Sequence, residues 1–356
     1  MNSTPGTLRL RSTEDLLTAI PYLIGYHPTD SVVCLAVRDA GTPVIVSAAL
    51  PPLDVDDIHA ATEAVAADVA AVFAVEASRA YLVGYGGPAQ VGMVIAQVWA
   101  ALDAVDVAVP IAVRATGRRY FCIDPDCDTC PAGGTAYDPD TSLIAVQSVV
   151  AGLAVLPDRA ALAASLHPVE GQRRTDMDAA CDRASQRMRA MLGAPANTAE
   201  RAVNSAGRTA AERAVATAET VPAWVVEAGL DALADALATA EAGQVLSDDE
   251  VGWLAVVLRI GVVQAAAWSV NTGDTWQRQL WTDVVRRATP ALTAVPACLL
   301  ASTAYLAGNG ALANIAVQQA LQVDPGTTFA RPMDFALSRG LPPQAWQQVL
   351  HSVIQG

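Results

Sequence analysis

The sequence predicts an α+β / α/β protein in which a mixed β-sheet domain with crossover helices precedes an all-helical domain. Two observations predict this division. Short β-branched runs alternate with helix-length segments only in the first part of the chain, and all but one of the seven tryptophans lie after residue 220. We therefore expect an α/β domain over residues 1–157 and a helical domain over residues 158–356.

The first expected element is a capped helix. Ser12 can cap it with Asp15 at the third helical position, and the apolar residues that follow continue to Ile24. We expect Gly25 to end this helix and Pro21 to kink it or split it into two turns.

The strands are expected from β-branched runs bounded by turn residues. Ser31–Val37 and Pro43–Leu50 flank Asp39-Ala40-Gly41, which is typical of an antiparallel hairpin. Later strands alternate with helices, which indicates right-handed crossovers and a partly parallel sheet. These strands are Arg79–Gly84, Val107–Ala115 and Arg118–Ile123, and the helices are Asp54–Val75 and Ala89–Ala104.

Helical patterns dominate the rest of the chain, beginning with the apolar segment Leu143–Leu156. Near the end, Val295–Leu306 and Ala311–Val323 with Gly308 between them resemble one tetratricopeptide-type helix pair. The bulky positions of that motif are not matched, and a solenoid needs about three units. A generic helical bundle is the alternative.

The basic residues limit the chemistry and the partners of this chain. All 22 are arginines, so no lysine is available for a P-loop or a Schiff base. The formal net charge of −14 disfavours nucleic acid as a partner. The best basic patch, Arg173–Arg213, mixes arginines with acids as a solvated helical face does.

Membrane insertion is not expected. Val251–Val270 has the length of a span, but Arg259 lies at its centre, where insertion costs about 2.5–3.5 kcal/mol. A buried helix is the preferred interpretation. The first twelve residues lack the apolar run of a signal peptide, so the expected location is the cytoplasm.

Three thiols form the best candidate metal site. Cys122, Cys127 and Cys130 have the spacing C-x4-C-x2-C in a loop rich in proline and glycine, which suits zinc or an iron–sulfur cluster. Structural zinc needs a fourth ligand, for which the neighbouring acids are candidates. A redox or disulfide loop and a plain structural turn are the alternatives. The three acids are Asp124, Asp126 and Asp128.

A second group of residues is a candidate for lining a ligand site. The sequence Gly84-Tyr-Gly-Gly-Pro-Ala89 lies between a strand and a helix and fits G-x-G-x-x-A, although Pro88 at a helix start explains it without a ligand. Close neighbours in sequence rarely form a catalytic triad, so a local turn is the alternative for the residues before the first strand. The candidates are His27, Asp30, Ser31, Gly84, Gly86 and Gly87.

Three segments carry a family resemblance: residues 21–31 (PYLIGYHPTDS), 120–131 (YFCIDPDCDTCP) and the ending from Gly308 to Trp346. Together they resemble the actinobacterial family catalogued as domain of unknown function 4192. The resemblance implies an actinobacterial cytoplasmic protein and brings no assigned activity. The resemblance also implies a cysteine loop in which two of the cysteines are often adjacent in sequence. In this chain Cys127 and Cys130 are separated by two residues. A cysteine spacing that varies in this way favours a structural turn over a fixed metal site.

These observations favour a non-catalytic binding or scaffolding protein whose helical domain binds a protein partner or self-associates. The alternative is an enzyme of the α/β half that acts on a phosphorylated or nucleotide-like small molecule. It would use the Gly84–Gly87 loop for the anion and His27 or Asp30 for proton transfer. No cofactor is expected apart from zinc at the thiols.

Overall fold

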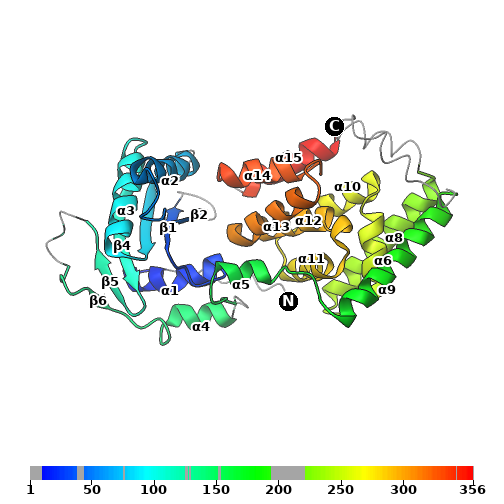
Figure 1. Ribbon diagram of the computed structural model, residues 1–356, viewed down its shortest axis with the longest axis horizontal. Helices are drawn as coiled ribbons and strands as arrows, with labels where there is room; N and C mark the ends of the chain where they lie inside the picture. Colours follow the sequence, from blue (N-terminus) through cyan, green and yellow to red (C-terminus); the bar gives the residue numbers. More distant parts are fainter. Residues whose placement is uncertain are drawn as a thin grey trace. The chain divides into compact units, whose positions relative to one another are not determined.

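The computed structural model describes residues 10–37, 44–74, 77–124, 127, 130–150, 154–193, 221–341 and 343–355 (Figure 1). The described part contains a mixed six-stranded sheet and 14 α-helices, which confirms the α+β fold class. The chain divides into two compact units. The first comprises residues 1–164 with the short segments 308–311 and 337–342, and the second comprises the remainder.

The sheet of the first unit has the strand order β2-β1-β3-β4-β5-β6. Neighbours β3 and β4 are parallel and the other neighbouring strands are antiparallel, so the sheet is mixed. The turn expected at residues 39–41 lies outside the described residues. The strands are β1 (Ser31–Val37), β2 (Val44–Ala49), β3 (Arg79–Tyr85), β4 (Ala108–Thr116), β5 (Arg119–Cys122) and β6 (Thr135–Ala136).

The helices of the first unit begin with the expected capped helix. Ser12 Oγ accepts a hydrogen bond from the Asp15 amide, and Gly25 ends the helix with a φ of 86°, a conformation that glycine adopts without strain. The helix is continuous through Pro21, so the proline does not split it. The helices are α1 (Thr13–Ile24), α2 (Ile58–Phe73), α3 (Pro88–Asp103), α4 (Leu143–Val150) and α5 (Arg159–Ala164).

The core of this unit lies between the sheet and helices α2 and α3, which lie along the sheet in Figure 1. Because side chains alternate along a strand, Val32, Leu82 and Ala112 share the face that these helices cover. The residue before or after each of these on its strand points to the opposite face of the sheet. Cys122 pairs with Val113 and therefore lies on that opposite face of the sheet.

The second unit is helical, as expected, and its core is built around tryptophans. Trp268, Trp281 and Trp346 are fully buried, and the indole N–H of Trp346 donates to Ser302 Oγ at 2.9 Å. The helices are α6 (Gln172–Met191), α8 (Ala223–Glu241), α9 (Asp248–Val257), α10 (Gly261–Ser269), α11 (Thr275–Arg287), α12 (Ala294–Leu306), α13 (Gly310–Val323), α14 (Ala330–Ser338) and α15 (Pro343–Gln355).

The long apolar run around Arg259 forms two helices and not one. Helix α9 ends at Val257, α10 begins at Gly261, and the two axes differ by 106°. Within the described ranges, no single helix is long and apolar enough to span a membrane, and the bent pair passes that test only when both helices are counted together.

The arginine-rich segment is described only as far as residue 193. There Arg174 donates to the Ala288 carbonyl and pairs with Asp178, and Arg183 pairs with Asp249. Arg187 stacks over the Trp253 ring at 4.1 Å. These three guanidinium groups therefore hold helices of the second unit together.

Candidate metal-binding site

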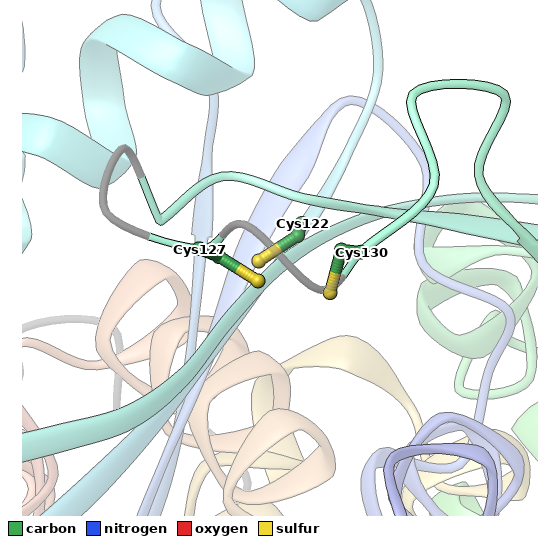
Figure 2. Close-up of side chains that lie close together, drawn as sticks. All are labelled: Cys122, Cys127 and Cys130. Carbon is green, nitrogen blue, oxygen red and sulfur yellow. The ribbon is translucent and has the colours of Figure 1, made fainter.

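Three cysteines converge at the end of strand β5. The Sγ atoms of Cys122, Cys127 and Cys130 all lie within 4.8 Å of one another, and Figure 2 shows the Cys122 and Cys127 sulfurs next to each other with the Cys130 sulfur beside them. Cys122 is the last residue of β5, and the other two lie on the loop that follows. By its donor atoms and their spacing, the group could hold a metal ion, one of the alternatives that the sequence leaves open.

The sheet positions the first thiol. Cys122 pairs with Val113 of β4, and the amide of Ile123 donates to the Ala112 carbonyl at 3.0 Å. The backbone on both sides of the Cys122 sulfur is therefore held by ladder hydrogen bonds.

The loop then folds back over this sulfur. The backbone N–H of Asp124 donates to the Cys122 thiol, and the carbonyl of Asp124 accepts from the Cys127 amide at 3.3 Å. An N–H donated to sulfur stabilises the thiolate, the form that binds a metal. Burial has the larger and opposite effect, so the pKa of Cys122 lies above its ordinary value.

The far side of the loop is tied to the same strand. The guanidinium of Arg119 donates to the carbonyls of Gly133 at 3.1 Å and Gly134 at 3.0 Å, and the Gly134 amide donates to the Pro131 carbonyl at 2.9 Å. Gly134 has a φ of +72°, and a Cβ there would lie 2.8 Å from the Tyr120 carbonyl oxygen. These contacts place the chain that follows the third thiol.

The three thiols hydrogen-bond to one another. The thiol–thiol hydrogen bonds, first with Cys127 and then with Cys122, raise the pKa of Cys130 to about 12, although its side chain is exposed. A bound cation removes these protons, because a coordinating thiol is deprotonated. Metal binding at this site therefore releases protons.

The separations suit zinc after a small closure. With Zn–S bonds of about 2.3 Å, tetrahedral ligands lie about 3.8 Å apart, about 1 Å less than the 4.8 Å within which the three sulfurs lie. No histidine or carboxylate among the described residues belongs to the group. Asp124 is described and is not part of it, whereas Asp126 and Asp128 lie outside the described residues. Among the described residues, the group therefore offers three sulfur ligands.

The other three cysteines are core residues. Cys34, Cys181 and Cys298 are buried, and all six cysteines are free thiols. Burial raises the pKa of Cys34 to about 12, so this thiol stays protonated at neutral pH. These cysteines contribute to packing and not to the thiol group.

Most of the second group of candidate residues, His27 apart, gathers at another end of the sheet. Strands β1 and β3 are antiparallel, and Ser31 at the start of β1 pairs with Tyr85 at the end of β3. The Asp30 carboxylate therefore lies near the glycine loop: a Cβ atom built on Gly86 would be 3.5 Å from Asp30 Oδ1. His27 is exposed, and its amide donates to the Leu156 carbonyl at 2.9 Å. Asp30, Ser31 and the glycine loop are thus neighbours.

Packing requires two of the three glycines in that loop. A Cβ on Gly84 would lie 2.1 Å from Val91 Cγ1 of α3, and one on Gly86 would lie 2.8 Å from Leu50 Cδ1. Gly86 also has a φ of +145°. Gly87 faces open space and caps α3. The loop therefore has a structural reason for Gly84 and Gly86, and the Asp30 carboxylate beside it repels a phosphate.

Sequence reasoning did not single out Arg119 or Gly134 as residues that shape the thiol loop. The pair Gly133-Gly134 after the third cysteine was a visible sign of a tight turn. The role of Arg119 has no such sign, because its carbonyl partners are brought to it only when β6 pairs with β5.

The fold and the thiol group define this chain as an α+β protein of two units with a candidate metal-binding loop. The chain belongs to the family described as domain of unknown function DUF4192, whose model matches residues 14–344. This match confirms the resemblance seen in three segments of the sequence. No curated protein matches the chain, and no solved structure matches it.

Proposed function

We propose that this chain is a non-catalytic binding protein whose α/β unit holds one zinc ion through Cys122, Cys127 and Cys130. The convergence of the three Sγ atoms within 4.8 Å carries the proposal. Zinc accepts three thiolates with a fourth ligand from water or another donor, whereas an iron–sulfur cluster takes four cysteines. Zinc is therefore the metal that this donor set fits best.

The ion would join the end of β5 to the loop that returns to β6. Cys122 belongs to the sheet and Cys130 does not, so a bond from each sulfur to one metal closes the loop. Metal bound only by the folded loop stabilises the folded state. This role is structural and needs no substrate.

Metal analysis of the full chain tests the proposal. Protein purified anaerobically under reducing conditions should contain close to one zinc per chain, and Cys130→Ser should lose it. Cys130 is exposed, so this substitution removes a ligand without opening a cavity. Cys181→Ala, which removes a buried thiol of α6, is the matched control and should keep its zinc. Wild-type protein without stoichiometric zinc would overturn the proposal.

For the helical unit, we propose a protein-binding or self-associating role. Trp224 of α8 is 52% exposed and Phe335 of α14 is 58% exposed. Aromatic side chains are enriched in protein interfaces, and these two support the proposal. The cytoplasm is the proposed location, which the six free thiols support because disulfides are rare there.

Self-association is measured by sedimentation of the full chain over a range of concentrations. The expected result is a dimer or larger species that dissociates in Trp224→Ser. Glu241→Gln, at another exposed position of α8, is the control and should leave the mass unchanged. A wild-type chain that remains monomeric at high concentration would rule out self-association and leave only a different protein as partner.

A further inference from the structure

We infer that the thiol group is a redox-responsive metal site, in which oxidation joins Cys127 to Cys130 as a disulfide and expels the ion. The inference rests on the proposed zinc function. It starts from the exposure of the three residues, because Cys130 is exposed whereas Cys122 and Cys127 are half-buried. An oxidant in solution therefore reaches Cys130 first.

The geometry selects Cys127 as the partner of Cys130. All three sulfurs lie within 4.8 Å of one another, but Cys127 and Cys130 have C-x2-C spacing and their thiols hydrogen-bond to each other. A disulfide requires the sulfurs to approach to about 2.05 Å. Cys122 is the last residue of β5 and is held by its pairing with Val113 of β4, whereas Cys127 and Cys130 lie outside the sheet.

The reaction uses a hydroperoxide as a two-electron oxidant. The Cys130 thiolate attacks the terminal peroxide oxygen, the O–O bond breaks, and Cys130 becomes a sulfenic acid as the leaving oxygen takes a proton. The Cys127 thiolate then attacks this sulfur, the S–S bond forms, the S–O bond breaks, and hydroxide leaves as water. With hydrogen peroxide, two zinc-bound thiolates, one peroxide and two protons from the solvent give one disulfide, two water molecules and the released zinc ion.

Disulfide formation removes two of the three sulfur ligands from the metal. Cys122 alone cannot hold zinc tightly, because structural zinc needs four ligands. The ion therefore leaves with the first disulfide. A thiol reductant returns two electrons to the sulfurs, and the site can then bind zinc again.

The test begins with zinc-loaded full-length protein whose metal content is measured before any oxidant is added. Hydrogen peroxide is then added in steps with a chromogenic zinc chelator present, and disulfides are mapped by mass spectrometry without reduction. One zinc should be released per disulfide formed, the disulfide should join Cys127 to Cys130, and reductant should restore zinc binding. Zinc retained by protein that carries this disulfide, or zinc released with a disulfide to Cys122, would overturn the inference.

The zinc content before and after oxidation separates this inference from the proposed zinc function. A chain that contains no zinc before oxidation refutes the zinc function and this inference with it, whereas a loaded chain that keeps its zinc under peroxide refutes only the inference. Cys122→Ser tests the pairing without the strand thiol and should still form the Cys127–Cys130 disulfide. Cys181→Ala should release zinc as the wild type does.

Discussion

The buried guanidinium of Arg287 on α11 donates to the carboxylate of Asp248 at the N-terminus of α9, at 2.5 Å. The side chain of Arg287 is only 5% exposed. It also donates to the Asp283 carboxylate at 2.6 Å and to the Leu246 carbonyl at 2.8 Å. Arg287 thus joins α11 both to the loop before α9, at Leu246, and to the first residue of α9, Asp248.

Replacing Arg287 should destabilise the helical unit. We expect Arg287→Met to lower the free energy of unfolding by about 2–3 kcal/mol, because charged hydrogen bonds are lost and the Leu246 carbonyl loses its donor. Arg183→Met is the control, since Arg183 and Asp249 form an exposed pair worth about 1 kcal/mol or less. Urea denaturation measures both. Equal losses in the two variants would contradict the central role of Arg287.

A side chain at residue 134 should weaken metal binding. In Gly134→Ala, the new Cβ would meet the Tyr120 carbonyl and the Phe121 ring, and the φ of +72° would be strained. We expect zinc affinity to fall about 10-fold or more, as for other substitutions of groups that position metal ligands. Competition with a chelator measures this. Gly133→Ala is the control because a Cβ there has nothing within 4 Å; a similar loss in Gly133→Ala would refute the argument from Gly134.

Gly84 should tolerate no side chain for reasons of packing. A Cβ at Gly84 would lie 2.1 Å from Val91 Cγ1, so Gly84→Ala must displace α3 from the sheet, and we expect a loss of about 1–3 kcal/mol. Gly92→Ala, at an interior position of α3 with open space around it, should stabilise by about 0.5–1 kcal/mol, because alanine has the higher helix propensity. Thermal unfolding compares the two variants, and a neutral Gly84→Ala would show that this loop adjusts more freely than its packing indicates.

The start of α9 should make the stability of the helical unit depend on pH. Hydrogen bonds from the Ser247 side chain and then from its backbone lower the pKa of Glu250 from its ordinary value of 4.5. Because the native pKa is the lower one, this stabilisation is fully present above pH 4.5 and is lost as the pH falls toward the native value.

Glu250→Gln should remove that part of the pH dependence. Unfolding measured by urea at several pH values between 3 and 7 should show a smaller difference between the variant and the wild type at the acid end. Glu63→Gln, on an exposed position of α2, should leave the curve unchanged. If the free energies of unfolding of the wild type and Glu250→Gln differ by the same amount at every pH in this range, the capping argument is contradicted.

Much of the fold could be predicted because local patterns were strong. The β-branched runs identified β1 to β5, and Ser12 with Asp15 identified the start of α1. Strand β6 was not predicted, since it has two residues and exists only through its pairing with β5. The break at Arg259 was also missed, because apolar residues continue on both sides of it.

The sequence by itself determined what chemistry this chain can offer. Without lysine it has no P-loop or Schiff-base amine, and its three closely spaced cysteines supply soft metal ligands. The tertiary structure decided whether those cysteines meet. Strand pairing holds Cys122, the Asp124 amide turns the loop back toward it, and Arg119 ties down the returning chain. Such contacts join residues that local sequence patterns do not connect, which is why only the folded chain shows them.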